Sequence, residues 1–337
     1  MIEHLLSQPI NRRQLTLGAA GLAALAVLPV TAHVASAATT ASSFSGLGYH
    51  ELKITITDDA FEGVKDSIPA GRYLLKVSSK VTDTSNGGGA VGFLSGAALG
   101  MSGKDLLQLL AASGGPAVDA SPSADATPSS GGDMNQVLPL EVYQLHFAGG
   151  VEAVVGQTTE GVIDLTPGEY LLWGDDPTAK QKPQVVKVTG TYPKDVKDPK
   201  ADVTATLIDF AITFDGDVTA GHHILKVQHM GAQPHFIDFE KGPDTMTKEQ
   251  VMTALMADPN ASPVAGGFSP QDLQPVFYSP TQSIGTVTYH EFDLKDGTYL
   301  AACFFPTAGT GVPHAMNGMV EVITVGGSAQ RGATPTS

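Results

Sequence analysis

The sequence contains a single cysteine, Cys303, and a single tryptophan in 337 residues. One cysteine cannot form a disulfide within the chain, so no disulfide framework holds the fold together. The motifs of a serine-hydrolase elbow, a phosphate-binding P-loop and a zinc-protease helix are also missing from the sequence. Cys303 is therefore a buried inert thiol, a thiol paired with another chain, or a metal ligand.

Basic residues are scarce. The chain has 19 lysines and arginines against 34 aspartates and glutamates, which gives a formal net charge of −15 at pH 7. An acidic surface of this kind repels the phosphates of nucleic acids and the headgroups of anionic lipids. The composition therefore excludes nucleic acid as an expected partner.

The apolar run near the N-terminus, residues 17–30, is shorter than the about 20 residues that a membrane span needs. Arg12 and Arg13 precede this run, and Ala35-Ser36-Ala37 follows it as a cleavage site. We predict an export signal over residues 1–37, of the twin-arginine type, with an ordinary secretory signal or an uncleaved anchor as alternatives. The mature protein is expected to be periplasmic, extracellular or at the cell surface, with no stable membrane span.

An internal repeat is the main feature that the sequence does contain. Two pairs of segments match: residues 68–77 with 218–227, and residues 163–172 with 292–301. Each copy has short alternating segments between Gly and Pro turns, and one helix-like segment, at 102–112 or 247–257. This pattern predicts an all-β protein of two antiparallel β-sandwiches in tandem, each with a short helical insert.

The composition also predicts the boundaries of the two copies. We expect a first domain over residues 48–190, a linker over 191–202 that is rich in lysine, aspartate and proline, and a second domain over 203–325. Residues 113–134 are mostly Ser, Ala, Pro and Gly, which predicts a disordered insertion in the first domain. The tail, 326–337, is expected to be disordered for the same reason.

Metal-ligand chemistry is concentrated in the second copy. His235 follows Pro234 at the start of an expected strand, and Cys303, His314 and Met319 follow in order before the last apolar strand. Two imidazoles, one thiolate and one thioether are the ligands that redox-active copper prefers. The second copy is therefore the candidate for a copper site.

These motifs resemble those of the cupredoxin fold family. The shared features are Gly-x-x-Pro-His at a strand start, Tyr-x-x-x-Cys in a late strand, and His-x4-Met leading into Gly-Met-Val. The resemblance covers residues 203–325 by motif, and the first copy by strand pattern only. It implies Greek-key sandwiches and one mononuclear copper held by His235, Cys303 and His314, with Met319 as the axial ligand. Met316 is a second axial candidate. More narrowly, the motifs resemble exported bacterial cupredoxin-like proteins of undefined role.

The spacing between cysteine and second histidine departs from the family pattern. Ten residues, 304–313, separate Cys303 from His314, whereas small blue-copper proteins have only a few. The free energy of closing a loop rises only slowly with its length, so a longer loop can still return His314 to the site.

The first copy lacks the ligands. Gly89 and Gly174 align with His235 and Cys303, so we predict that the first copy is metal-free and acts as a packing partner or a separate recognition surface. We expect His222, His223 and His229 to be surface residues and Asp175 to lie in a solvated turn.

The sequence therefore predicts an exported copper-binding protein that acts in electron transfer or copper handling, with a redox or copper-donor protein as its partner. The alternative is a metal-free β-sandwich that serves as a binding or structural module. We predict that the protein is not an enzyme. Copper oxidases and two-domain nitrite reductases need a second copper centre, usually with a histidine directly beside the cysteine, where this chain has Ala302 and Phe304.

Overall fold

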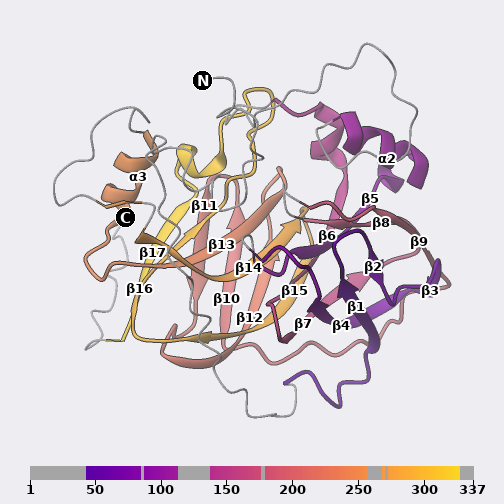
Figure 1. The fold of residues 1–337 in the computed structure, drawn as a ribbon, viewed down its shortest axis with the longest axis horizontal. Helices are drawn as coiled ribbons and strands as arrows, with labels where there is room; N and C mark the ends of the chain where they lie inside the picture. The colour runs from indigo at the N-terminus through magenta and orange to yellow at the C-terminus, as the bar shows by residue number, and fades with distance from the viewer. Residues whose placement is uncertain are drawn as a thin grey trace.

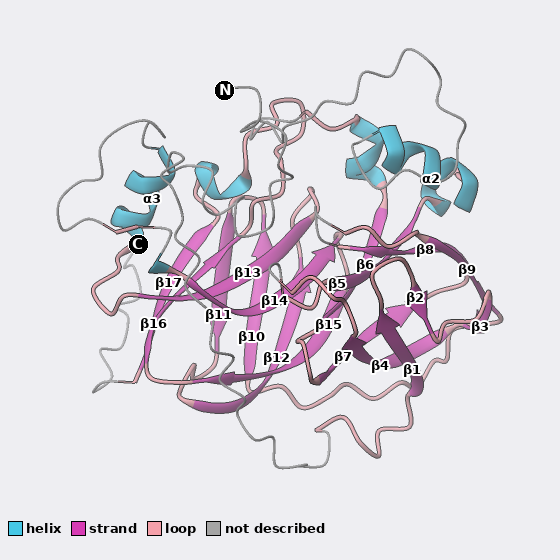
Figure 2. Ribbon diagram, in the orientation of Figure 1, coloured by secondary structure: helices cyan, strands magenta, loops and turns pink. Residues whose placement is uncertain are grey.

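The fold is described from a computed structural model, which covers residues 43–84, 87–112, 137–175, 179–256, 268–269 and 272–326. The predicted export signal and the predicted insertion over 113–134 lie outside these residues, as does the predicted tail after Gly326. Strands dominate the described part of the chain, and the helices are short (Figures 1 and 2). The prediction of an all-β protein is confirmed. Among the described residues, no helix has the length and apolar character that a membrane crossing requires.

Within the described residues, the strands form one sheet of eight and one of nine. The first sheet has the order β11-β10-β12-β15-β7-β4-β1-β2. Its strands are β1 His50–Ile56, β2 Phe61–Glu62, β4 Gly71–Ser79, β7 Thr158–Leu165, β10 Val203–Ile208, β11 Ala211–Asp215, β12 Gly221–His229 and β15 Val287–Leu294. The second sheet has the order β17-β16-β13-β14-β6-β5-β8-β9-β3. Its strands are β3 Ser67–Pro69, β5 Ala90–Ser95, β6 His146–Glu152, β8 Gly168–Gly174, β9 Gln184–Thr189, β13 His235–Gly242, β14 Gln274–Gln282, β16 Gly297–Ala302 and β17 Val320–Val325.

The helical inserts begin at hydrogen-bonded caps. The hydroxyl of Ser102 accepts a bond from the Asp105 N–H before α2, and the hydroxyl of Thr247 accepts one from the Gln250 N–H before α3. Helix α2 spans Gly103–Ala112 and α3 spans Lys248–Met256, which confirms the two predicted inserts. The 3-10 helices are η1 Ala97–Leu99, η2 Leu140–Gln144 and η4 His314–Asn317.

The two copies pair their strands in the same way. In the first copy β4 is parallel to β1 and antiparallel to β7, and in the second copy β12 is parallel to β10 and antiparallel to β15. Even the register agrees, because Gly71 lies opposite Leu165 while Gly221 lies opposite Leu294. These are positions that the sequence repeat aligns. The repeat is therefore a repeat of structure.

Equivalent strands of the two copies also pair with each other. Strand β7 is antiparallel to β15, with Val162 opposite Tyr289, and β6 is antiparallel to β14, with Ala148 opposite Gln282. Equivalent strands therefore pair at the two junctions, β7 with β15 and β6 with β14. The strand order on one side of each junction mirrors the order on the other, which gives the topology an approximate two-fold symmetry.

Both sheets therefore run through both copies. One hydrophobic cluster likewise holds side chains from each copy, among them Phe147 and Leu94 from the first and Phe239 and Val227 from the second. The division into separate domains over 48–190 and 203–325 stays a prediction, because the pairing at the junction joins the copies.

Candidate metal centre

Three candidate ligands come from separate segments that meet at one end of the second sheet. His235 begins β13, Cys303 directly follows β16, and His314 begins η4. Strands β13 and β16 are antiparallel neighbours, with Asp238 opposite Ala302, so the start of one lies beside the end of the other. The Ala315 N–H donates to the Cys303 carbonyl, which holds η4 against the end of β16.

The donor atoms of these residues converge. Nδ1 of His235 lies 2.9 Å from Nδ1 of His314, and the Cys303 sulfur lies 3.8 Å from the first nitrogen and 3.7 Å from the second. The point equidistant from the three atoms is about 2.0 Å from each, which matches a zinc–histidine bond and is about 0.3 Å shorter than a zinc–cysteine bond. All three residues are fully buried. The arrangement thus fits a single metal ion in the plane of the three donors.

Met319 is tied to this cluster through its backbone. Its N–H donates to the His314 carbonyl, and its own carbonyl accepts from the Cys303 N–H. Met319 is fully buried in the same hydrophobic cluster as Cys303, whereas Met316 packs against a different cluster beside α3. The packing favours Met319 over Met316 as the axial candidate, while ligation by its sulfur stays a prediction.

Asp209 fixes the orientation of His235. Its carboxylate lies 2.9 Å from Nε2 of His235 and also accepts the N–H groups of Ala232 and Gln233. Burial raises the pKa of Asp209, but these three hydrogen bonds outweigh it and the net effect lowers the pKa. A carboxylate can only accept, so we assign the proton of His235 to Nε2, which leaves Nδ1 bare and turned toward the other donors.

Gln233 plays the corresponding part for His314. Its side-chain oxygen lies 3.4 Å from Nε2 of His314 and accepts the Ala308 N–H at 2.7 Å. Without a metal, Nδ1–H of His314 donates to the bare Nδ1 of His235. With a metal on Nδ1, the His314 proton belongs on Nε2, facing Gln233.

Burial keeps all three donors neutral when no metal is bound. Desolvation lowers the pKa of His235 to about 3 and that of His314 to about 4, and it raises the pKa of the Cys303 thiol to about 12. A bound cation reverses this preference for the thiol, because a metal ligates the thiolate. Metal binding to Cys303 therefore releases a proton.

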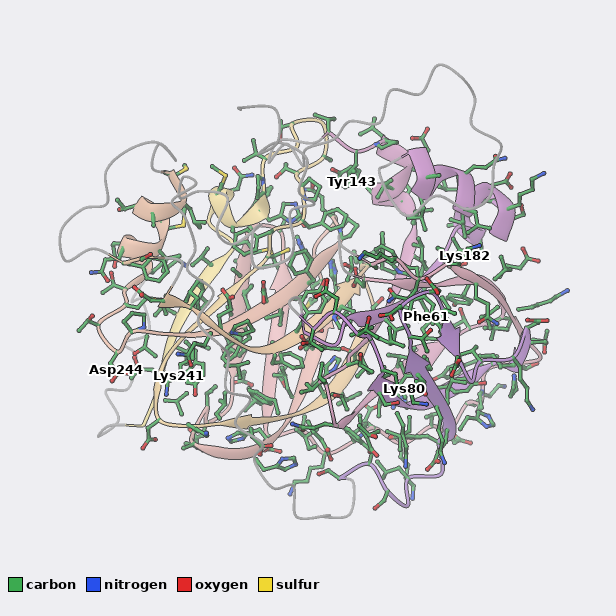
Figure 3. All side chains as sticks on the ribbon, viewed as in Figure 1. Phe61, Lys80, Tyr143, Lys182, Lys241 and Asp244 are labelled. Atoms are coloured by element: carbon green, nitrogen blue, oxygen red, sulfur yellow. The ribbon has the colours of Figure 1, made fainter. Side chains whose placement is uncertain are left out.

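The long connection between Cys303 and His314 is closed at its base. Pro306 and Pro313 form an isolated β-bridge, and the Thr307 N–H donates to the Val312 carbonyl at 2.8 Å. The hydroxyl of Tyr143, a residue of η2 in the first copy, donates to the Pro306 carbonyl at 2.9 Å; Tyr143 is labelled in Figure 3. Residues 304–313 therefore form a loop, the excursion, whose two ends are held together. This is why the longer spacing still returns His314 to the cluster.

Phe210 packs against His314 in a strained conformation. Its φ of 64° makes it the one non-glycine residue of the described chain in the left-handed region. Its ring meets the His314 ring edge-on, with 5.3 Å between centroids. Strain of this kind persists only where the surroundings enforce it, and it is frequent at functional sites.

Three predictions about individual residues were wrong. His223 is 7% exposed rather than at the surface. His229 is 2% exposed rather than at the surface, and its ring stacks on His235 with 4.7 Å between centroids. Burial lowers the pKa of His229 to about 4, and neither ring nitrogen has a hydrogen-bond partner among the described residues. Asp175 is also buried, where its carboxylate accepts the N–H of Thr281. Alternation along β12 could have identified His229, since Leu225 and Val227 face inward with it.

Sequence reasoning also missed Asp209 and Gln233. No spacing in the sequence marks either residue as a partner of the ligands. Asp209, for example, reaches His235 from the turn between β10 and β11. In the first copy, Gly89 and Gly174 occupy the aligned positions of His235 and Cys303. Among the described residues, His235, Cys303 and His314 make up the one cluster of three metal-binding side chains.

Comparisons with known proteins return solved structures only, since no family model and no curated protein matches the chain. A reduced auracyanin from Roseiflexus castenholzii is 19% identical, with 37% of this chain and 95% of that chain covered, at a TM-score of 0.24. A copper-containing nitrite reductase from Thermus scotoductus is 8% identical over 82% of this chain and 62% of that chain, at 0.19. A blue copper oxidase from Nitrosomonas europaea is 10% identical over 82% of this chain and 86% of that chain, also at 0.19.

These matches contradict the prediction that the chain is not an enzyme, because a nitrite reductase and a copper oxidase are among the matched structures. Ala302 and Phe304, the two positions beside the cysteine, do not by themselves decide whether the chain is an enzyme. Identities of 8 and 10% do not make the chain an enzyme either.

The sequence motifs, the repeated strand pairing and the convergence of His235, Cys303 and His314 agree with one another. The fold of this chain is cupredoxin-like.

Proposed function

We propose that this protein binds one copper ion through His235, Cys303 and His314, with Met319 as the axial ligand, and acts in electron transfer or copper handling. The observation that carries the proposal is the set of three donor distances, which leave a common point about 2.0 Å from each atom. Two imidazoles and a thiolate in one plane are the ligand set of a blue-copper site.

Copper bound here would supply a centre that accepts and releases one electron. The protein residues hold and shield that centre. Asp209 and Gln233 orient the two imidazoles through Nε2, and complete burial of the three donors keeps bulk water away from them. The rings of Phe210 and Phe305 pack against the ring of His314.

Electron transfer and copper handling use the same ligands, so the two functions differ in the partner protein that each requires. We propose a redox protein in the first case and a copper-donor protein in the second. Reversible reduction of the bound copper at an electrode, without loss of metal, supports electron transfer. Release of copper to a competing chelator on reduction supports handling.

We also propose that each copy is a cupredoxin-like unit, over residues 48–190 and 203–325, and that only the second binds metal. The first copy then supports the site by packing, since Tyr143 of η2 anchors the excursion at Pro306. The signal over residues 1–37 supports export to the periplasm, the exterior or the cell surface. Fractionation of cells that express the full chain tests this location.

The visible absorption spectrum of the mature protein with one equivalent of Cu(II) tests the copper proposal. We expect an intense thiolate-to-copper band that is lost in Cys303→Ser and strongly altered in His235→Gln and His314→Gln. His222→Gln is the matched control, because His222 is exposed and lies at the opposite end of β12 from His229, the residue that stacks on His235. A band that survives in Cys303→Ser contradicts the proposed ligand set.

The metal-free module is a second candidate, favoured by one observation. Without metal, the two imidazoles already satisfy each other through the 2.9 Å contact between their Nδ1 atoms. A protein built to stay metal-free would keep the same melting temperature when copper is added. A copper-binding native state must be stabilised by mass action, so a large copper-dependent rise in melting temperature excludes this candidate.

A further inference from the structure

Thioether side chains gather on the outer side of the second copy, next to the candidate metal centre. Met252 and Met256 lie four residues apart on α3, so they occupy the same face of the helix. Met316 lies on η4, which α3 contacts. Met252 and Met316 are half-buried against one hydrophobic cluster, while Met256 is 62% exposed. Figure 3 shows sulfur atoms, in yellow, on α3 and on the short helical turn beside it.

The first copy provides an internal comparison for these methionines. Counting from the caps at Ser102 and Thr247, the buried Leu106 of α2 corresponds to the buried Val251 of α3. The next two positions on the outer face differ in chemistry but not in exposure. Leu107 is half-buried like Met252, and Ala111 is exposed like Met256.

These two helix positions are therefore equally exposed in both copies. In the copy without metal ligands, leucine and alanine occupy them. Thioethers occupy these positions only in the copy that carries His235, Cys303 and His314. Methionine sulfur is a soft, polarizable donor that selects Cu(I) over harder cations. The difference between the copies thus follows metal chemistry.

We propose that Met252, Met256 and Met316 form a surface binding site for Cu(I), from which the ion is passed to the buried ligands. This inference rests on the proposed function, because the buried site is the destination. Met316 connects the two sites, since it lies two residues after His314 on η4. The ion keeps its oxidation state during the transfer. It exchanges thioether ligands for the two imidazoles and the Cys303 thiolate, and the thiol proton goes to solvent.

The test is an anaerobic Cu(I) titration of the mature protein, followed by the methyl NMR signals of its methionines. We expect the methyl signals of Met252, Met256 and Met316 to shift at low Cu(I), while that of Met101, next to α2 in the first copy, does not. In a Met252→Leu, Met256→Leu, Met316→Leu variant, the chain should bind one Cu(I) fewer and load the buried site about tenfold more slowly, because the local supply of metal is lost. Leucine conserves volume, so the variant should fold. Met101→Leu is the control.

Failures of the two proposals are distinguishable. If Cys303→Ser binds as much Cu(I) as the unchanged protein while the three methyl signals still shift, the buried site fails and the surface site stands. If the triple variant matches the unchanged protein in stoichiometry and loading rate, or Met101 shifts as much as the other three, the surface site is excluded.

Discussion

The carboxylate of Asp209 lies 2.9 Å from Nε2 of His235, on the side of the imidazole away from the other donors. This contact decides which nitrogen carries the proton, and so it presents the bare Nδ1 to Cys303 and His314. Asp209 itself is about one-third exposed, at 31%, whereas His235 is fully buried. It therefore links a buried ligand to the surface of the protein.

Replacing Asp209 should weaken copper binding without removing the ligands. We expect Asp209→Asn to lower copper affinity about 10- to 100-fold, because the uncharged amide holds the Nε2 proton less strongly. A chelator-competition titration measures the change. Asp215→Asn, at an exposed carboxylate on β11, is the control. Equal affinities for the two variants would contradict an orienting role for Asp209.

The thiol of Cys303 should be unreactive in the metal-free protein. Burial raises its pKa to about 12, so at pH 8 the thiol stays protonated, and the side chain is fully buried. We expect an aromatic disulfide reagent to react with the native protein only at the rate of unfolding, and rapidly in denaturant. Fast reaction of the native protein at pH 8 would show that the site opens without unfolding.

The stability of the metal-free protein should fall in acid. Desolvation lowers the pKa of the buried His290 to about 3, whereas an unfolded histidine titrates near 6.5. Below pH 6.5 the His290 imidazole binds a proton in the unfolded state but not in the folded state. The free energy of unfolding therefore falls by about 1.4 kcal/mol per pH unit between pH 6.5 and about 3. His229, His235 and His314, whose pKa values are also lowered, act in the same direction.

Urea unfolding of the metal-free protein between pH 4.5 and 7.5 measures this slope. The free energy of unfolding of His290→Gln should depend less steeply on pH than that of the unchanged protein, because one histidine with a lowered pKa has been removed. A stability that does not change over this range would mean that water or a conformational change solvates these histidines.

Backbone strain at Phe210 can be measured apart from the loss of its ring. Both Phe210→Ala and Phe210→Gly remove the contact with His314, but only glycine accepts a φ of 64° without strain. We therefore expect the glycine variant to be more stable than the alanine variant by about 1 kcal/mol in urea unfolding. The opposite order would show that the turn between β10 and β11 relaxes once the ring is removed.

Local patterns in the sequence were enough to predict the short-range structure. The capping residues Ser102 and Thr247 located both helices, and the matched glycines at 71 and 221 located equivalent strands with the same register. These signals succeed because caps and turns depend on residues a few positions apart. The order of His235, Cys303 and His314 was also enough to name the residues that the structure brings together.

The sequence by itself determined the repeat, the β-rich fold and the chemistry of the candidate ligands, since composition and alternation record these directly. Only the tertiary structure decided how the copies join and which side chains orient the imidazoles. The physical reason is distance along the chain. The pairing of β7 with β15, and the contact of Asp209 with His235, depend on packing between segments that no local pattern connects.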